Sequence, residues 1–392
     1  MNLLITSVEA IINSSTMSPY DGIIEALQNF RSSKDGNLVI VVSSNPDKLY
    51  AVPDGFEIFL SPREERTTSL INSILKQYNS FTIGDVILLG AKDMDFYLAV
   101  NNRVLLLSAL YAYKGARDQQ KVLSYGIPIR VIDNLNLFFN INQKINRPWF
   151  YKLVVSRVTT IYSLTNANTY YTSKNLEKMN LAFQDCLKQG NTTNFSLFLV
   201  YFLISSFSPQ TVNDFRQIDF WGIYPSSGLD VNDSLEAFKE YIRKMYKGKP
   251  DVRANRMQPP ILERIEPTYQ RHKLGSQKRV SDGCDEQFKT IRINPNYREQ
   301  LRGATVCIID DYTTYGTSCE TARALLEAAG VKKLIFVALG KFGLEYYQYS
   351  YKILGDVFGK YEFFRESVKR RQDYALNNTS TKVFVDSLSG LV

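Results

Sequence analysis

The chain has 392 residues, of which 44% are hydrophobic and 22% charged, and this ordinary globular composition excludes wholesale disorder. Its length is sufficient for two or three domains, each with its own core. The four cysteines are scattered without metal-ligand spacing, which indicates a reducing cytoplasm and argues against a disulfide framework. Because His272 is the single histidine, a multi-histidine metal site is excluded, and a Ser-His-Asp triad would depend on that residue alone.

The net charge of +8 favours an acidic partner, either nucleic acid or a phosphorylated small molecule, with a lysine-rich solvated surface as the alternative. The most apolar run, residues 195–207, is shorter than the roughly 20 residues that cross a bilayer, so it predicts a buried helix. The first residues lack the basic flank and cleavage region of a signal peptide. We therefore expect a cytoplasmic protein with no membrane partner.

Residues 1–142 alternate short apolar runs with helical patterns, which is typical of a parallel, doubly wound sheet. One helix is expected to start with Ser18 as its cap and Pro19 at its first position. A second helix is expected over residues 64–78, where apolar side chains share one face. The expected strands are residues 3–5, 38–42, 56–60, 86–89, 104–107 and 129–132.

The alternation of apolar runs with helical patterns stops after residue 142 and resumes near residue 218. The middle segment is interpreted as a helical bridge, and the stretch 248–285, which is basic and interrupted by proline and glycine, predicts a mobile loop. The expected fold is α/β, with two doubly wound domains, 1–142 and 218–392, joined by the helical segment 143–217. Helices are expected over residues 176–188, 195–207, 233–246 and 319–329, and strands over 220–224, 305–309 and 333–339.

The segment from Val306 to Ser318 carries the residues that point to chemistry. Four apolar residues predict a strand, Asp310 and Asp311 follow at its carboxyl end, and a turn leads into a helix. Ligands of open α/β sheets bind outside the carboxyl ends of strands, and a helix N-terminus favours a phosphate dianion. Paired carboxylates suit ribose hydroxyls, a magnesium ion or positive charge at an anomeric carbon. Close backbone approach is possible at Gly316, and further donors come from the hydroxyls of Thr314, Thr317 and Ser318.

This segment resembles the 5-phosphoribosyl-1-pyrophosphate (PRPP) motif of type I phosphoribosyltransferases: four apolar, two acidic and two variable residues, then Thr-Thr-Gly-x-Thr/Ser. The resemblance implies that Asp310 and Asp311 are catalytic, hold the ribose hydroxyls and take part in binding Mg²⁺. Tyr315 departs from the motif, because the family has its second threonine there. The alternative is a strand-turn-helix with an acidic turn and no ligand. The residues implied to bind the 5′-phosphate are Thr314, Tyr315, Gly316, Thr317 and Ser318.

Two weaker matches point to a pyrophosphate site. The run Pro225, Ser226, Ser227 and Gly228 follows an expected strand and resembles the family's pyrophosphate loop, although such a run is also typical of an ordinary turn. The residues Leu262, Arg264, Thr268, Gln270 and Arg279 have a spacing similar to that in competence-type (ComF-like) phosphoribosyltransferases. That resemblance implies that the two arginines cover the pyrophosphate, with a solvated basic surface as the alternative.

The family resemblance covers about residues 218–341 and implies displacement of pyrophosphate from PRPP by a nucleophile. No residue pattern indicates the acceptor. The aromatic stretch 343–364 could stack a base, but it is more typical of core and interface.

The first domain resembles, more weakly, the haloacid dehalogenase-like phosphatases. Residues 41–45, which end in Ser44 and Asn45, match that family's second motif, and residues 89–95 resemble its acidic motif. However, Ser7 occupies the position of the nucleophilic aspartate, and Ala91 that of a magnesium carboxylate. Because aspartyl-phosphate chemistry requires both groups, we expect an inactive domain, with an unrelated α/β domain as the alternative.

A disarmed domain fused to a phosphoribosyltransferase resembles effectors of bacterial antiphage loci, including retrons, in which a reverse transcriptase and its nucleic acid hold the effector. This resemblance implies a magnesium-dependent enzyme that acts as a conditional toxin. The alternative is a non-catalytic module that senses a phosphorylated nucleotide or docks on nucleic acid. The expected partners are PRPP or a phosphorylated nucleoside, and nucleic acid in a reverse transcriptase-type complex that contacts the basic stretch from Arg243 to Arg279. The oligomeric state is left open, with a homo-oligomer as one option.

The missing carboxylates give a first prediction. The purified protein should not hydrolyse an aryl phosphate above background in magnesium buffer, because neither Ser7 nor Ala91 can supply the carboxylate that the reaction needs. Release of the aryl alcohol, followed by absorbance, measures this. Turnover that disappears in Ser7→Ala would contradict the expectation.

Overall fold

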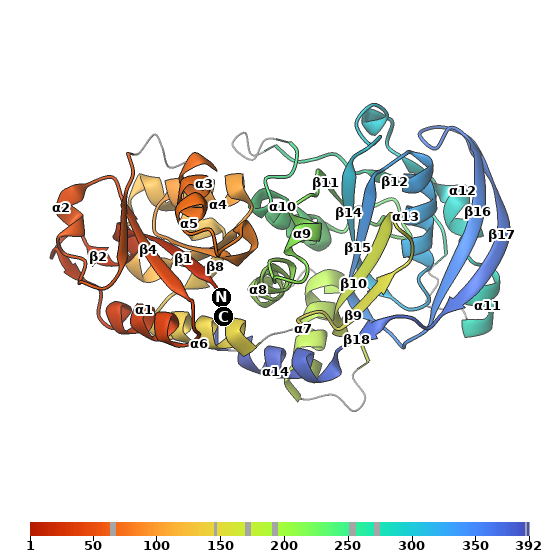
Figure 1. The fold of residues 1–392 in the computed structure, drawn as a ribbon. Coiled ribbons are helices and arrows are strands. Elements are labelled where there is room, and N and C mark those ends of the chain that lie inside the picture. Colours follow the sequence, from red (N-terminus) through yellow and green to blue (C-terminus); the bar gives the residue numbers. More distant parts are fainter. Residues whose placement is uncertain are drawn as a thin grey trace.

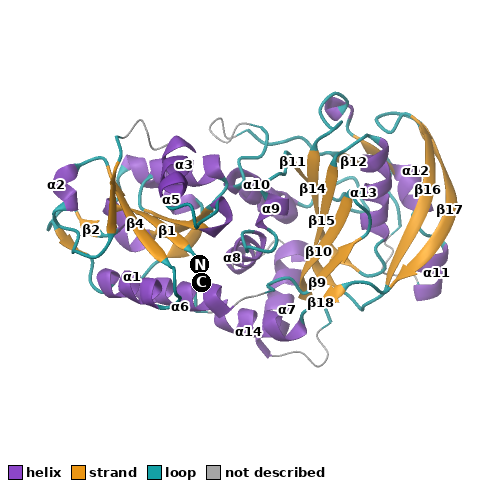
Figure 2. Cartoon of the chain, in the orientation of Figure 1, coloured by secondary structure: helices purple, strands orange, loops and turns teal. Residues whose placement is uncertain are grey.

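The computed structural model describes residues 1–62, 68–144, 147–168, 174–189, 195–250, 256–269, 275–388 and 390–391. His272, Gln270 and the start of the helix expected over residues 64–78 lie outside these ranges. The chain is mixed α/β and contains two six-stranded sheets, one parallel and one mixed (Figure 1; Figure 2 colours the helices and strands).

All neighbouring strands of the first sheet are parallel, in the order β5-β4-β1-β6-β7-β8. Taken in chain order this is 3-2-1-4-5-6, a doubly wound sheet in which the direction of winding reverses at the first strand. Helices cover both faces (Figure 1), so the inner strands are nearly continuous apolar runs. The strands are β1 (Leu3–Ser7), β4 (Leu38–Ser43), β5 (Glu57–Leu60), β6 (Val86–Gly90), β7 (Leu105–Ala109) and β8 (Ile127–Ile129).

Two boundaries in this half differ from expectation. Ser18 and Pro19 form β3 (Ser18–Pro19), which pairs with β2 (Ile12–Asn13), so Ser18 caps no helix. The first helix begins only at Ile23, after Gly22 in a left-handed conformation. The strand expected over residues 129–132 ends at Ile129, and a helix follows. The helices are α1 (Ile23–Ser32), α2 (Pro46–Leu49), α3 (Thr68–Gln77), α4 (Asp93–Asn102), α5 (Gln120–Ser124) and α6 (Ile132–Lys144).

The second sheet has the order β11-β14-β15-β10-β9-β18. The first four of these strands are parallel, and the last two run antiparallel to their neighbours. The strands are β9 (Tyr151–Val154), β10 (Thr159–Asn166), β11 (Phe220–Ile223), β14 (Thr305–Thr313), β15 (Lys333–Lys341) and β18 (Ala375–Leu376).

The segment 143–217, expected to be a helical bridge, therefore supplies two strands to the second sheet. β10 is buried although it contains several polar residues. Its polar groups find partners, since Thr165 Oγ1 donates to the Leu339 carbonyl at 3.1 Å and the Tyr162 hydroxyl donates to Asp214 at 2.6 Å. The expected helices are present in the same segment as α7 (Lys174–Gln189) and α8 (Phe195–Ser206), followed by α9 (Val212–Phe215).

Helices and two-stranded ribbons surround the second sheet. The loop expected over residues 248–285 contains a short strand and a helix, and residues 251–255 and 270–274 of it lie outside the described ranges. The ribbons are β12 (Leu262–Arg264) with β13 (Ile291–Ile293) and β16 (Tyr346–Gly355) with β17 (Tyr361–Arg371). The helices are α10 (Asp233–Met245), α11 (Ser276–Ser281), α12 (Asp285–Thr290), α13 (Thr317–Ala328) and α14 (Asn378–Leu388).

One hydrophobic core runs from the first sheet through α8 to one face of the second sheet. α8 lies between the two sheets (Figure 1). Its Phe202 packs against the rings of Trp149, Phe215, Trp221 and Phe238, with centroids 5.6–6.4 Å apart. In the described part of the chain, no helix is long and apolar enough to cross a membrane. The apolar side chains of α8 are thus buried in the core that the two halves share.

The shared core predicts cooperative unfolding. Phe202→Ala should lower the free energy of unfolding by about 3–5 kcal/mol, because it leaves a cavity in an aromatic cluster. Urea unfolding followed by tryptophan fluorescence and far-UV circular dichroism should show one coincident transition that moves to lower urea in the variant. Val131→Ala, at a side chain that is 54% exposed, is the control. Two separate transitions in the wild type would contradict a single core.

Candidate functional site

The carboxyl ends of the neighbouring parallel strands β11 and β14 meet at one edge of the second sheet. A cavity of about 610 Å³ opens there, between the segments that follow these strands. Every predicted site residue lines it except Gly228 and Gly316. The predicted residues that it brings together are Pro225, Ser226, Ser227, Arg264, Arg279, Asp310, Asp311, Thr314, Tyr315, Thr317 and Ser318.

The acidic pair lies inside β14, whereas the sequence suggested that it follows the strand. Pairing with β15 continues as far as Thr313, which extends the strand past both carboxylates. Asp310 is buried and accepts the N–H of Asp311 at 2.9 Å, and Asp311 in turn accepts the N–H of Tyr312 at 2.6 Å. Burial, and secondly the neighbouring Asp311 charge, raises the pKa of the Asp310 carboxyl well above its ordinary value. Asp310 therefore holds its proton more readily than an exposed carboxyl.

Gly316 turns the chain from β14 into α13. Its φ of +89° is left-handed, and a Cβ at this position would overlap the ring of Tyr346 in β16. Both facts restrict the position to glycine. The helix begins directly afterwards at Thr317, so its unpaired N–H groups and positive dipole end lie beside the cavity that Thr317 and Ser318 line.

A buried carboxylate holds Tyr346 in this place. Glu320, in the first turn of α13, accepts the Tyr346 hydroxyl at 2.5 Å and the Tyr349 N–H at 2.9 Å. Arg323 forms an ion pair with the same carboxylate at 2.7 Å and donates to the Tyr349 carbonyl at 2.6 Å. Burial, together with the Glu320 charge, raises the pKa of the Tyr346 hydroxyl well above its ordinary value, so this group remains a donor. The ribbon β16–β17 is thereby fixed against α13.

Lys341, at the end of β15, supports the turn from the other side. Its buried ammonium group donates to the carbonyls of Thr314, Phe342 and Glu345 at 2.5, 3.2 and 2.9 Å. Burial lowers the pKa of Lys341 to about 8. Because the Thr314 carbonyl is held by this cation, the peptide groups of the turn are fixed in orientation.

Tyr315, which departs from the family motif, packs to the side of the turn. Its ring meets that of Tyr347 edge-on at 5.9 Å, and its carbonyl accepts the Tyr347 N–H at 3.0 Å. The guanidinium of Arg279 lies over the Tyr315 ring, 5.1 Å from its centroid. The tyrosine thus joins α11 to the turn, and Arg279 is held over the cavity.

Arg264 is bound to the loop that follows β11, whereas Arg279 lies over the Tyr315 ring. Its guanidinium donates to the Ser226 carbonyl, to Thr290 Oγ1 at 2.6 Å and to Gln287 Oε1 at 2.9 Å. A longer contact of 3.4 Å reaches the Pro225 carbonyl. Arg264 therefore fixes the loop that follows β11 in place, rather than pointing freely into the cavity.

Sequence reasoning missed several residues of the cavity and its support. Lys341 ends an otherwise apolar run, and a lone lysine at the carboxyl end of an expected strand was the available signal. Tyr312 and Thr313 occupy the two variable positions of the motif, and Thr268 contributed only to the spacing of the basic stretch. The other missed residues lie outside the motifs, so their pairing with the site required the fold. The missed cavity residues are Tyr224, Asn232, Leu235, Thr268, Tyr269, Gln287, Tyr312, Thr313 and Phe342.

The side chains that line the cavity at Asp310 limit which metal ions could bind there. Across the described ranges, no group of three or more His, Cys, Asp or Glu side chains is placed to bind a metal ion. Mg²⁺ is commonly held by one or two carboxylates together with waters and substrate phosphates. Asp310 and Asp311 fit that pattern if a phosphorylated ligand supplies further oxygens.

The residues that resemble phosphatase motifs also share one edge of a sheet. Ser7 ends β1, and the strands on either side of it are β4 and β6. Residues 41–43 end β4, and Ala91 follows β6. In the described structure, Ser7 Oγ and Glu9 Oε2 are buried without a hydrogen-bond partner. Glu9 Oε1 pairs with Lys48 at 3.2 Å.

Lys341 gives a prediction that depends on pH. If the cavity binds the ribose 5-phosphate that the sequence leads us to expect, replacing Lys341 with methionine should weaken that binding about tenfold, because the turn loses a charged hydrogen bond worth at least ~1.5 kcal/mol. Wild-type affinity should fall as pH rises through about 8, where Lys341 loses its proton, and the variant should lack this step. Calorimetry between pH 7 and 9.5 measures both. Lys332→Met, at an exposed lysine, is the control, and an unchanged pH profile in Lys341→Met would contradict the role.

No family model matches the sequence, and no curated protein matches it. The function of the cavity at Asp310 must consequently be argued from its own residues and geometry.

Proposed function

We propose that the chain is a phosphoribosyltransferase-type enzyme that binds PRPP, or a related ribose 5-phosphate, in the cavity at Asp310. One observation carries the proposal: an acidic pair, the N-terminus of α13 and the loop that follows β11 all line the same cavity. The helix N-terminus suits the 5′-phosphate, the acidic pair suits the ribose hydroxyls, and the loop suits the pyrophosphate. A strand end with only a structural role has no need of two adjacent carboxylates, one of them buried.

In this proposal the 5′-phosphate binds at the turn from Thr314 to Ser318. The helix dipole and N–H groups favour a dianion there, and the hydroxyls of Thr317 and Ser318 add donors. The ribose hydroxyls donate to Asp310 and Asp311. The pyrophosphate group lies towards Pro225–Gly228 and Arg279, while Arg264 keeps that loop in position.

The proposed reaction is a displacement at the anomeric carbon. The bond from C1 to the pyrophosphate oxygen breaks, its electron pair leaves with pyrophosphate, and a nucleophile, usually a ring nitrogen, forms the new bond. Positive charge develops on the ribose, and the carboxylates of Asp310 and Asp311 stabilise it. Bound Mg²⁺ would neutralise the pyrophosphate and be held by these carboxylates together with phosphate oxygens. No histidine is needed, which fits the composition.

The raised pKa of Asp310 suits this role. Burial and the Asp311 charge disfavour the ionised form of Asp310 while the cavity is empty. A bound cation, or positive charge that develops on the ribose, favours the ionised form of Asp310. Both carboxylates are then charged when the reaction takes place. Positioning and charge stabilisation then supply most of the catalysis.

The first half of the chain has a regulatory or assembly role in this proposal. Ser7 and Ala91 cannot supply phosphatase carboxylates, yet this half shares its core with the second half. A conditional effector in an antiphage system, held by a nucleic-acid-bearing complex, is a biological setting that agrees with this arrangement and with the +8 charge.

The acidic pair gives the decisive prediction. Asp310→Asn with Asp311→Asn should weaken PRPP binding in magnesium by at least about a hundredfold, because each lost charged hydrogen bond costs about 1.5–3 kcal/mol. Titration calorimetry measures the affinity, and circular dichroism checks that the fold is retained. The double variant Asp35→Asn with Asp54→Asn, at exposed carboxylates of the first half, is the charge-matched control.

Equal PRPP affinity in the wild type and the acidic-pair variant, or no binding to the folded wild type, would contradict the proposal. Turnover is tested in cells. Mass spectrometry of metabolites and nucleic acids after expression should reveal a ribosylated product in the wild type that is missing in Asp310→Asn.

A further inference from the structure

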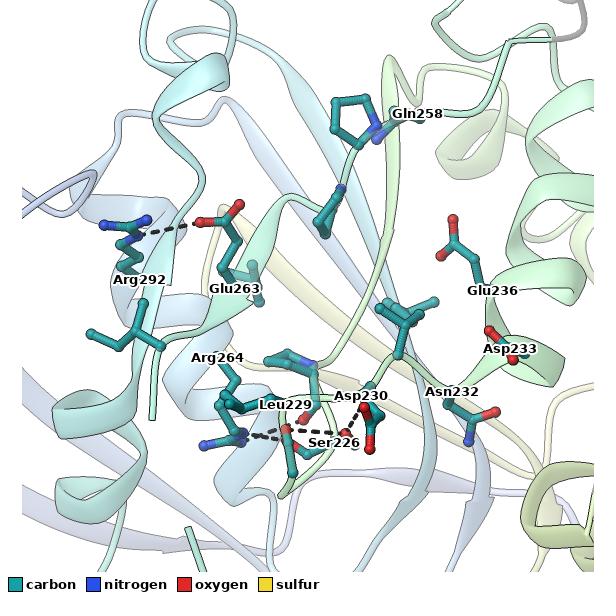
Figure 3. A pocket seen from close by; sticks show the side chains of 18 of the residues that line it. Ser226, Leu229, Asp230, Asn232, Asp233, Glu236, Gln258, Glu263, Arg264 and Arg292 are labelled. Carbon is teal, nitrogen blue, oxygen red and sulfur yellow. Dashed lines mark hydrogen bonds and ion pairs between the residues drawn. The ribbon is translucent and has the colours of Figure 1, made fainter. Parts of the chain in front are cut away.

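A second and larger cavity, of about 990 Å³, is also lined by the loop that follows β11 (Figure 3). We call it the outer groove. It is bounded by the loop from Pro225 to Asn232, the first turn of α10 and the segment from Met257 to Ile265. Figure 3 shows Asp233 and Glu236 on one side of it and Glu263 and Arg292 on the opposite side. Pro225, Ser226, Asn232 and Arg264 line both cavities, so the loop borders each of them.

The lining of the outer groove exposes several apolar side chains together. Leu229, Val231, Met257 and Ile265 are 59%, 54%, 66% and 45% exposed. Prolines 259 and 260 and the buried Leu262 extend this apolar surface. Contiguous exposed apolar surface in a concave site is typical of a surface that binds a ligand. The body of that ligand should therefore be apolar.

Four of the six charged side chains that line the outer groove are carboxylates, and two of the four form no ion pair with another described residue. Glu263 pairs with Arg292 at 3.2 Å, and Glu236 pairs with the buried Lys239 at 2.7 Å. Within the ranges that the structure covers, neither Asp230 nor Asp233 forms an ion pair, and both are exposed. The groove thus presents negative charge to a ligand.

The remaining cation of the lining does not offset this charge. The Arg264 guanidinium is already engaged by two loop carbonyls, Thr290 and Gln287. A phosphate or carboxylate ligand would meet Asp230 and Asp233 with like charge, which disfavours it. A ligand with a positive group would find two acceptors beside an apolar surface.

We propose that the outer groove is a binding site for a small organic cation, in which an ammonium or guanidinium group is carried on an apolar or aromatic body. The cationic group binds Asp230 and Asp233, and the body packs on Leu229, Val231 and Met257. A volume of about 990 Å³ is at the upper end of the range for small-molecule sites, roughly 300–1,000 Å³. The site is separate from the acidic pair and does not depend on the proposed transferase activity.

Titration calorimetry of the full-length protein with tryptamine tests this inference, because tryptamine combines an ammonium group with an aromatic body. Tryptophol, which has the same body with a neutral hydroxyl, is the matched probe. Saturable tryptamine binding at least tenfold tighter than that of tryptophol is expected, and it should weaken as salt is raised.

Variants identify the site of binding. Asp230→Asn with Asp233→Asn should weaken tryptamine binding at least tenfold, whereas Asp35→Asn with Asp54→Asn, the same change of charge elsewhere, should leave it unchanged. Asp310→Asn with Asp311→Asn should also leave it unchanged, which separates this site from the proposed PRPP site. Absence of saturable binding, equal binding of tryptophol, or loss of binding in the Asp310–Asp311 variant instead would overturn the inference.

Discussion

The buried carboxylate of Glu320 determines how the parts around the turn at Gly316 fit together. A charge without solvent is tolerated only when it is paired and hydrogen-bonded, and Glu320 receives Arg323, the Tyr346 hydroxyl and the Tyr349 N–H. These contacts hold β16 on α13 and place the Tyr346 ring against Gly316. Removing one partner would leave an uncompensated buried charge, which is far more costly than losing a surface ion pair. The geometry of the turn thus depends on a network whose residues do not line the cavity.

Some polar groups around the cavity at Asp310 hold the surrounding loops in place, whereas others only face the space. The Lys341 ammonium donates to three backbone carbonyls, and the Arg264 guanidinium donates to two carbonyls and to the side chains of Thr290 and Gln287, so both fix loops on either side of the acidic pair. Asp311, Ser318 and Arg279 line the space itself. A rigid support with a small number of facing groups is the arrangement that preorganised electrostatic stabilisation requires.

The sequence predicted the strands that flank the motif and the order of its parts, because apolar runs and glycine turns are local signals. Where β14 ends was not predictable in this way, since the strand extends to Thr313 only through pairing with Lys341 in a distant segment. β10 was missed for a related reason. Its polar residues look unsuited to a buried strand until their partners, the Leu339 carbonyl and Asp214, are placed. Ser18 and Pro19 resemble a helix start, yet Tyr20 N–H donates to the Ile11 carbonyl and keeps that segment extended.

The position of α8 has a consequence for how this chain can be divided. Nine of its twelve residues are buried, and its apolar side chains belong to the hydrophobic core that the first sheet shares with one face of the second. α14, near the end of the sequence, packs on α6, α7 and α8 and so returns to the boundary between the halves. A gene cut between β8 and β9 would leave α8 in the second product only, and the core that the two halves share would be exposed in both products. Such apolar surface promotes aggregation. The two halves should therefore be inherited, expressed and degraded as one unit.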